Sequence, residues 1–397
     1  MAKSSKIKVG IIGVGNCAKS LVEGVQYYAE NNKEETGVMK TDIGGYLAGD
    51  VEFVIGFDID ERKTGLGLGK ALKQRPNCAW DIVDTIKCNA PVFESPVIDG
   101  YAGLMDSYPE ENRFLVSEKL RNSTDMNRVS WTTKLERSWK DSIIKELKKR
   151  DVEVLVNYLP VGSQKTTEFW AEICLETGIS FVNCIPVFIA SDPAWEQRFI
   201  DAGIPLIGDD MRSQFGASIL SQMLQELAFE RGHHVKAHIQ RNVGGNTDFL
   251  NMEDKSRLAS KKISKENVIR AQNDIRNIST EDSFLHAGPS EYIHYYGDNK
   301  VANFRLELEG FGGSPVIFDA QLSVQDSPNS AGVVIDAIRY LKVARELGVV
   351  GALRGPSAFT RKTPPDQMMF SDAVYECTEL ANRRLTESTS KQMNDEN

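Results

Sequence analysis

The sequence lacks the features of a membrane-spanning or secreted chain. Its 397 residues contain no uncharged apolar run of about 18 residues, the length that a membrane helix needs. Residues 1–6 lead directly into a short apolar run, without the apolar region and cleavage site of a signal peptide. The six cysteines form no CxxC pair and no zinc-finger spacing, which favours free thiols. We therefore expect a cytoplasmic protein with no membrane partner.

Markers of nucleic-acid binding, metal binding and nucleophilic hydrolysis are also missing. The formal net charge is −9, whereas nucleic acid requires a basic face, so we expect no nucleic-acid partner. His233, His234 and His238 lack HExxH spacing and an adjacent carboxylate motif, which favours core or surface roles over a metal site. No GxSxG serine motif occurs. No ligand cluster identifies a divalent metal or a monovalent cation, so that requirement stays open.

Apolar runs that alternate with helical patterns dominate the first half of the chain. The strand candidates are residues 7–12, 51–57, 152–158, 180–185 and 205–208. Runs that are apolar on both faces are typical of strands covered by helices on both sides. The alternation predicts an α/β fold with a Rossmann-type doubly wound parallel sheet.

The texture changes near residue 235, where polar and apolar residues begin to alternate. The strand candidates here are residues 235–241, 291–296, 302–308 and 315–319. This pattern predicts a second α+β domain that carries an open antiparallel sheet. An exposed sheet face is a natural surface for oligomerisation.

A GVGNCA motif at residues 13–18 follows the first predicted strand and fits the GxGxx[G/A] pattern. Gly13 would permit a tight turn, and Gly15 would let the backbone approach a pyrophosphate. Ala18 is small enough for the following helix, whose N-terminus would face the phosphates, to pack on the strand. We predict four cofactor contacts in this motif: Gly13, Gly15, Asn16 and Cys17.

Asp58 follows the second predicted strand. A carboxylate at this point accepts hydrogen bonds from the adenosine ribose and repels a 2′-phosphate, which favours NAD over NADP. Asp58 lies well beyond the roughly 20 residues expected after the turn, because residues 26–50 are inserted before the strand. Nearby Arg62 and Lys63 leave NADP as the alternative.

A polar turn at residues 208–217 leads into a predicted helix, 218–229. Amides at a helix start can bind a phosphate, and the Ser213 hydroxyl would add a donor. An ordinary capped helix is the alternative interpretation. The candidates in this turn are Asp210, Ser213, Gln214, Phe215, Gly216 and Ala217.

Residues 242–248 (NVGGNTD) combine amides, glycines and a carboxylate, which suits a polyhydroxylated ligand or a hairpin turn. Lys261 and Lys265 are four residues apart and would share one side of a helix, where a solvated lysine face is the usual explanation. Lys300 and Lys362 stand in the loop-like contexts GDNK and RKTPP.

Together these motifs resemble the myo-inositol-1-phosphate synthases (inositol-3-phosphate synthases), especially their bacterial and archaeal type. Several distant motifs in the right order are more specific than any one of them. They are GVGNCA at 13–18, GDD and SQ in 208–214, NVGGNTDFLNM at 242–252, SKKISK at 260–265, GDNK at 297–300, Asp326-Ser327 and RKTPP at 361–365.

The resemblance implies that the chain isomerises D-glucose 6-phosphate to 1L-myo-inositol 1-phosphate as a homotetramer. NAD would oxidise C5, which acidifies the C6 proton; after enolisation C6 would attack the C1 aldehyde, and the same NADH would reduce the product. The implied organisation is an NAD-binding Rossmann domain (1–234), a catalytic and oligomerisation domain (235–327), a return to the Rossmann domain (328–385) and a disordered tail (386–397).

The resemblance also implies residue roles. Lys261 would handle the C5 hydroxyl proton, while Lys265 and the 213–217 amides would bind the substrate phosphate. Lys300 and Lys362 would stabilise charge on the oxygens at C5 and C1. The orienting residues would be Asp210, Asp248, Asp326, Asn242 and Asn246, with Asp298 and Ser327 near the cofactor.

Two other functions remain open at this point. An NAD-dependent sugar-phosphate or semialdehyde dehydrogenase on a similar two-domain plan would release NADH stoichiometrically. An NAD-sensing or scaffolding protein would bind the cofactor without turnover. The lysines and aspartates in polar motif loops favour an enzyme.

Overall fold

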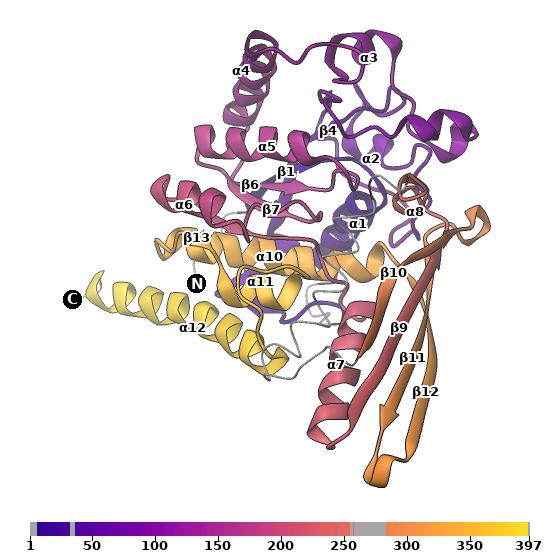
Figure 1. Ribbon diagram of the computed structural model, residues 1–397. Coiled ribbons are helices and arrows are strands. Elements are labelled where there is room, and N and C mark those ends of the chain that lie inside the picture. The colour runs from indigo at the N-terminus through magenta and orange to yellow at the C-terminus, as the bar shows by residue number, and fades with distance from the viewer. Residues whose placement is uncertain (1–5, 32–35, 255–256, 258–282, 396–397) are drawn as a thin grey trace.

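The computed structural model describes residues 6–31, 36–254, 257 and 283–395 (Figure 1). Its larger sheet has seven strands, and all neighbouring strands are parallel. They are β1 (Ile7–Ile12), β4 (Val51–Asp58), β5 (Val92–Glu94), β6 (Val154–Asn157), β7 (Ser180–Asn183), β8 (Pro205–Ile207) and β13 (Gly351–Ala352). Their spatial order, β13-β8-β7-β6-β1-β4-β5, reverses direction between β1 and β6. The Rossmann-type doubly wound sheet is therefore confirmed.

Helices cover both faces of this sheet (Figure 1). Ile7, Val9 and Ile11 of β1 pack into one apolar core and Ile12 into the other, because side chains alternate between the faces of a strand. The first core contains α1 (Asn16–Glu30) and α10 (Pro328–Glu346), and the second contains α4 (Thr133–Lys149), α5 (Gln164–Thr177) and α6 (Pro193–Asp201). The predicted two-sided burial of β1 is thus confirmed.

The chain returns to the first core through α10, which packs against α1. The buried pair Asp336 and Arg339 on α10 also holds the inserted segment: Asp336 accepts from Met39 N at 2.8 Å, and Arg339 donates to Thr41 O at 2.8 Å. In that segment β2 (Asp42–Ile43) pairs with β3 (Tyr46–Leu47), and η1 (Ala48–Asp50) leads into β4. The insertion that separates Asp58 from the glycine turn is therefore anchored on α10.

Short helices complete the part of the molecule that is built around the larger sheet. They are α2 (Leu68–Ala71), η2 (Gly103–Ser107), η3 (Glu110–Asn112), α3 (Glu118–Thr124) and α11 (Arg354–Thr360). The last helix, α12 (Phe370–Asp395), continues through most of the tail that we predicted to be disordered from residue 386. No glycine or proline interrupts the sequence after Phe370, so nothing in it stops the helix. The prediction of a disordered tail is therefore wrong for residues 386–395.

The second sheet has the order β10-β9-β11-β12. Its strands are β9 (His234–Gly244), β10 (Phe284–Tyr292), β11 (Asn299–Glu309) and β12 (Pro315–Gln325), and η6 (Phe311–Gly313) lies in the β11–β12 turn. β9 pairs in parallel with β10, so the sheet is mixed and not purely antiparallel as predicted. Residues 245–283 join these two strands, a connection long enough for a parallel crossover. The predicted strand 291–296 is also wrong beyond Tyr292, because η5 (His294–Tyr296) follows.

Helix α7 (Ala217–Glu230) covers one face of the second sheet (Figure 1). Ala302, Phe304 and Leu306 of β11 pack against it with Ala217. Short α8 (Thr247–Asn251) follows β9. Among the described residues, no helix is both long and apolar enough to cross a membrane.

Candidate active site

The predicted glycine turn joins β1 directly to α1. Gly13 has φ +89°, and a Cβ there would lie 2.7 Å from Tyr158 O, so the turn requires glycine. A Cβ on Gly15 would meet no atom within 4 Å, so this part of the turn borders open space. The arrangement fits a pyrophosphate above the turn, at the N-terminus of a 15-residue helix.

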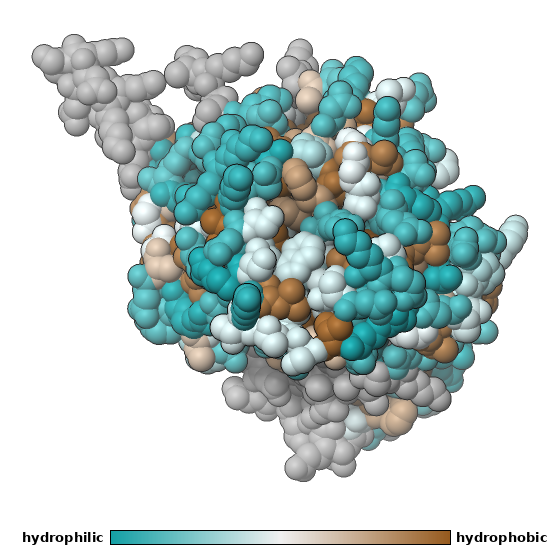
Figure 2. All heavy atoms as spheres, turned by 90° about the horizontal axis from the view of Figure 1, so that it is seen from above, coloured by the Kyte–Doolittle hydropathy of each residue, from teal (hydrophilic) through white to brown (hydrophobic). Residues whose placement is uncertain are grey.

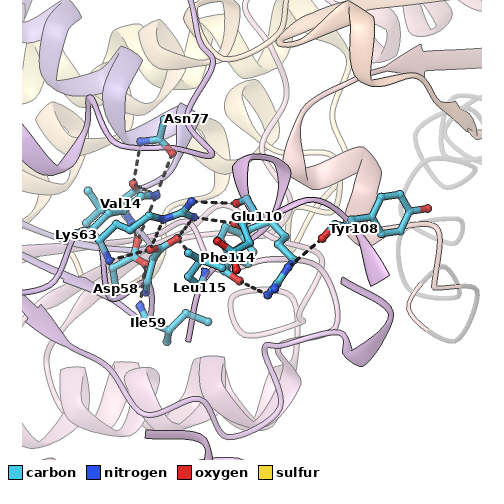
Figure 3. A network of polar contacts seen from close by, with 12 residues as sticks. Val14, Asp58, Ile59, Lys63, Asn77, Tyr108, Glu110, Phe114 and Leu115 are labelled. Atoms are coloured by element: carbon cyan, nitrogen blue, oxygen red, sulfur yellow. Dashed lines mark hydrogen bonds and ion pairs between the residues drawn. The ribbon is translucent and has the colours of Figure 1, made fainter. Parts of the chain in front are cut away.

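Asp58 ends β4 beside this turn (Figure 3). Its Oδ2 accepts a hydrogen bond from Val14 N at 2.7 Å, and its Oδ1 accepts from Ile59 N and Asp60 N, both at 2.8 Å. The carboxylate therefore holds the turn in place. The predicted contact with a ribose uses the same group, and the two roles are compatible because a carboxylate has about four acceptor sites.

The two basic residues that left NADP open bind protein groups, and Figure 3 labels one of them, Lys63. Lys63 Nζ also lies 4.0 Å from Asp58 Oδ2. Arg62 donates to Asp60 through Nε at 2.9 Å and Nη2 at 2.5 Å, and to Glu110 O through Nη1. Lys63 is buried and donates to Val14 O at 2.9 Å and to Asn77 Oδ1 at 3.0 Å. Neither lines the cavity next to Asp58.

That cavity lies where the carboxyl ends of β1 and β6 diverge, the usual ligand position in a doubly wound sheet. Residues that follow β1, β4 and β6 line one side, and residues from the second sheet and the α10 and α11 ends line the other. It brings together fifteen predicted site residues: Gly13, Gly15, Asn16, Cys17, Asp58, Asp210, Ser213, Ala217, Asn242, Asn246, Asp248, Lys300, Asp326, Ser327 and Lys362. Lys261 and Lys265 lie outside the described residues.

Two lysine–aspartate pairs face this cavity. Lys300 near the start of β11 pairs with Asp326 just after β12, because the antiparallel register places Asn299 opposite Gln325. Lys362 Nζ lies 2.8 Å from Asp210 Oδ1. The backbone supports the second pair, since Lys362 N donates to Asp210 O at 2.7 Å. Each ammonium group is therefore held at the cavity wall by a carboxylate from a distant segment.

Asp298, which we predicted to contact the cofactor, lies behind the wall and does not line the cavity. Its Oδ1 accepts from Asn246 Nδ2 at 3.1 Å and from Ser327 Oγ at 2.8 Å, and its Oδ2 accepts from Ser327 N. Burial, with a smaller contribution from Asp326, raises the pKa of Asp298 to about 6. The structure therefore gives Asp298 the geometry of a residue that orients Asn246 and Ser327.

The predicted phosphate turn reaches the cavity only in part. Ser213 and Ala217 line it, whereas Gln214, Phe215 and Gly216 do not. Gln214 N donates to Asn329 O at 2.6 Å, and Phe215 N donates to Asn329 Oδ1 at 3.1 Å. Two of the five amides proposed for a phosphate thus hold the turn to α10.

Several lining residues were missed from the sequence. The Tyr158 hydroxyl is buried with no hydrogen-bond partner among the described residues, and burial raises its pKa well above the usual value. Tyr158 directly follows β6, and that position at the carboxyl end of a strand was the available signal. Gln240 lies two residues before Asn242 on the same face of β9, so strand periodicity would have identified it.

Burial raises the pKa of all six cysteine thiols. All six cysteines are free thiols, as predicted, and burial raises the pKa of Cys17 beyond the range of a reactive thiolate. Among the residues that the structure describes, no group of three or more histidine, cysteine, aspartate or glutamate side chains is placed to hold a metal ion.

Comparisons with known proteins identify relatives of this chain. Residues 216–327 match the family model described as myo-inositol-1-phosphate synthase. The chain is 41% identical over 369 residues to an inositol-3-phosphate synthase of Corynebacterium glutamicum, covering 92% of this chain and 95% of that one. It is 40% identical to an inositol-3-phosphate synthase of Mycolicibacterium smegmatis, with coverages of 92% and 95%.

A solved structure shares the fold. The crystal structure of a myo-inositol-1-phosphate synthase-related protein from Thermotoga maritima matches with a TM-score of 0.73 at 23% identity, covering 95% of this chain and 98% of that chain. The resemblance noted in the sequence is therefore confirmed over most of the chain's length, and the chain belongs to the myo-inositol-1-phosphate synthase family.

Proposed function

We propose that this protein converts D-glucose 6-phosphate into 1L-myo-inositol 1-phosphate and retains NAD through each catalytic cycle. The observation that carries the proposal is one cavity that joins a dinucleotide turn to two lysine–aspartate pairs. A dehydrogenase needs the first element, whereas aldol ring closure, in which the enol carbon C6 attacks the C1 aldehyde, also needs cations beside developing oxyanions. Family membership supports the same reaction.

The residues of the turn fit NAD. Gly13 gives the required backbone, Gly15 opens onto the cavity, and Asp58 carries the charge that disfavours a 2′-phosphate. Arg62 and Lys63 are engaged with other groups, which removes the main argument for NADP. NAD would accept a hydride from C5 of the sugar and later return it.

The chain's own groups would then manage charge and protons. Lys300 and Lys362 would hold the oxygens at C5 and C1, where negative charge develops during oxidation, enolisation and ring closure. Asp326 and Asp210 fix these ammonium groups in place. Asn242, Asn246 and Asp248 would orient hydroxyls, and Ser213 with Ala217 would contact the phosphate. Lys261 is assigned the C5 hydroxyl proton and Lys265 the phosphate.

Product analysis tests the proposal. Protein supplied with glucose 6-phosphate and substoichiometric NAD should form inositol 1-phosphate without net NADH. NADH that accumulates in proportion to product would instead identify a dehydrogenase, and cofactor binding without turnover would identify a sensing or scaffolding protein. Lys261→Ala should abolish turnover and leave NAD binding intact, and retained turnover would remove Lys261 from catalysis.

The second sheet supports a further part of the proposal, a cytoplasmic homotetramer. Figure 2 shows one face of the molecule on which hydrophilic residues predominate and apolar residues are scattered. The second sheet differs at the β11–β12 turn, where Phe311 of η6 and Ile317 and Phe318 of β12 are 101%, 55% and 39% exposed. Such apolar exposure is typical of a surface that meets another chain. Light scattering should give four times the 44.2 kDa chain mass, and a monomer would contradict this part. Six free cysteines suit a reducing compartment.

A further inference from the structure

A row of buried polar side chains lies between α7 and β9. His238, Gln240 and Asn242 share one face of β9 because they alternate along the strand. Ser221 and Gln225 are four residues apart on α7 and face the same row. All five side chains are at least 97% buried. None of them belongs to the glycine turn or to the lysine–aspartate pairs.

These side chains form one continuous hydrogen-bonded chain. Gln225 Nε2 lies 3.0 Å from His238 Nδ1, and His238 Nε2 lies 3.0 Å from Ser221 Oγ. Ser221 Oγ donates to Gln240 Oε1 at 2.8 Å, and Gln240 Nε2 donates to Asn242 Oδ1 at 2.9 Å. Asn242 Nδ2 then donates to Gly288 O at 2.9 Å. Gln240 and Asn242 line the cavity, so the chain runs from inside the protein to the cavity wall before it ends at Gly288 O.

The donors of this chain all point the same way. The single Ser221 hydroxyl proton goes to Gln240, so Ser221 must accept from His238 Nε2. His238 is therefore the neutral Nε2–H tautomer and accepts from Gln225 at Nδ1. Burial lowers the pKa of His238 to about 4, which agrees with a neutral ring.

Packing alone does not require this arrangement. The adjacent row Ala302, Phe304 and Leu306 on β11 packs against the same helix with apolar side chains only. Burying amides, a hydroxyl and an imidazole costs free energy unless each is hydrogen-bonded, and an apolar row avoids that cost. The polar row therefore points to a role at its cavity end.

That role concerns the amides of Gln240 and Asn242. Asn242 uses one lone pair of Oδ1 and one hydrogen of Nδ2 within the chain, which leaves one acceptor and one donor. A sugar hydroxyl whose proton is committed to another acceptor can only accept here, and one whose lone pairs are already used can only donate, so binding depends on which amide atom faces it. Rotating the Asn242 amide by half a turn would exchange the two atoms and would also set Oδ1 against the Gly288 carbonyl oxygen, so that carbonyl fixes the direction of the chain.

We propose that Ser221 and His238 are positioning residues that hold the amides of Gln240 and Asn242 in the orientation set by the Gly288 carbonyl, for recognition of a substrate hydroxyl. This role rests on the proposed function, because it requires a polyhydroxylated substrate in the cavity. Ser221 and His238 act only through the two amides and touch no reacting atom.

The first test removes the Ser221 hydroxyl. Ser221→Ala should lower kcat/KM for glucose 6-phosphate on the order of 10-fold, the scale of supporting hydrogen bonds at other sites, with unchanged NAD affinity. Ser221→Thr keeps a hydroxyl and should recover most of the loss. His238→Phe breaks the same chain at similar volume and should reproduce the loss, which guards against poor folding of any single variant. An unchanged kcat/KM in both Ser221→Ala and His238→Phe would overturn the proposal.

A double-mutant cycle tests the path of the effect. In an Asn242→Ala background, adding Ser221→Ala should cause little further loss, because the positioned amide is already gone. If Asn242→Ala and Ser221→Ala lower kcat/KM by independent factors that multiply in the double variant, Ser221 acts by another route and the proposal is overturned. Leu224→Ala is the matched control, since it removes packing from the same helix without touching the chain. It should lower thermal stability and largely keep kcat/KM, and a loss as large as that of Ser221→Ala would identify general loosening.

Failure of the proposed function would look different. Unaltered protein that forms no inositol phosphate rejects the proposed function. Active unaltered protein whose Ser221→Ala and His238→Phe variants are equally active rejects only the positioning role.

Discussion

The two walls of the cavity are built on different principles. On the cofactor side, Gly13, Gly15 and Asp58 come from one β–turn–α unit and the next strand, and backbone N–H groups hold the carboxylate. On the other side, Lys300 and Lys362 come from distant segments, and each is held by an aspartate side chain. The first wall depends on local backbone geometry and the second on how the sheets meet. We therefore expect damage to the first to weaken NAD binding and damage to the second to slow turnover.

The largest effect should come from the lysine wall. Lys362→Ala should lower kcat about 10³-fold, the scale for removing one group that stabilises a developing oxyanion. The NAD dissociation constant, measured by calorimetry, should stay within a few-fold of the original. Lys236→Ala is the control, because Lys236 pairs with Glu309 on the second sheet and does not line the cavity. Equal loss of NAD binding and turnover would remove the distinction between the walls.

Asp58→Asn should have a smaller effect, and on NAD binding instead of turnover. The charged hydrogen bonds that Asp58 accepts from the turn, and the one proposed from a ribose, are worth about 1.5–3 kcal/mol each, so NAD affinity should fall about 10- to 100-fold. At saturating NAD the variant should keep most of the original kcat, since Asp58 is assigned a contact with the cofactor and none with glucose 6-phosphate. A lowered kcat at saturating NAD would show that the cofactor wall also shapes the reaction.

The smallest effect concerns Asp298, which links Asn246 and Ser327. Burial raises the pKa of Asp298 from its ordinary value of 3.8 to about 6 in the folded protein, so between these values the folded state binds more protons than the unfolded state. Its contribution to the unfolding free energy is therefore lowest above pH 6 and rises as the pH falls. Between pH 7 and pH 5 the gain should be about 1 kcal/mol. Urea denaturation of the unaltered protein should show this gain, and Asp298→Asn should lack it; the same pH dependence in both proteins would refute the assignment.

Local features could be predicted from the sequence. The glycine turn and Asp58 lie where the sequence predicts them, because strand, turn and helix signals lie within a few residues of one another. The lysine–aspartate wall was predicted only through the order of its motifs in a family. Its pairing depends on the antiparallel register of β11 and β12 and on backbone contacts between Asp210 and Lys362, neither of which leaves a local pattern.

The incorrect predictions also involve contacts between segments that are distant in the sequence. The parallel pairing of β9 with β10 depends on the path of the connection between them, and strand patterns do not report that path. Polar alternation in β9 looked like an open face, yet His238 and Gln240 point toward α7 and are buried. Asn329 binds the Gln214 and Phe215 amides from a distant helix, which no pattern near those residues could reveal.

In the proposed reaction, C5 of the substrate passes a hydride to the cofactor, and the hydride returns to the same carbon within each cycle. Glucose 6-phosphate labelled with deuterium at C5 tests it most directly, with NAD present at far less than the substrate concentration. Inositol 1-phosphate should keep the label through many turnovers, with no build-up of reduced cofactor. Product that lacks the label, or reduced cofactor that accumulates in proportion to product, would rule out return of the hydride to the sugar.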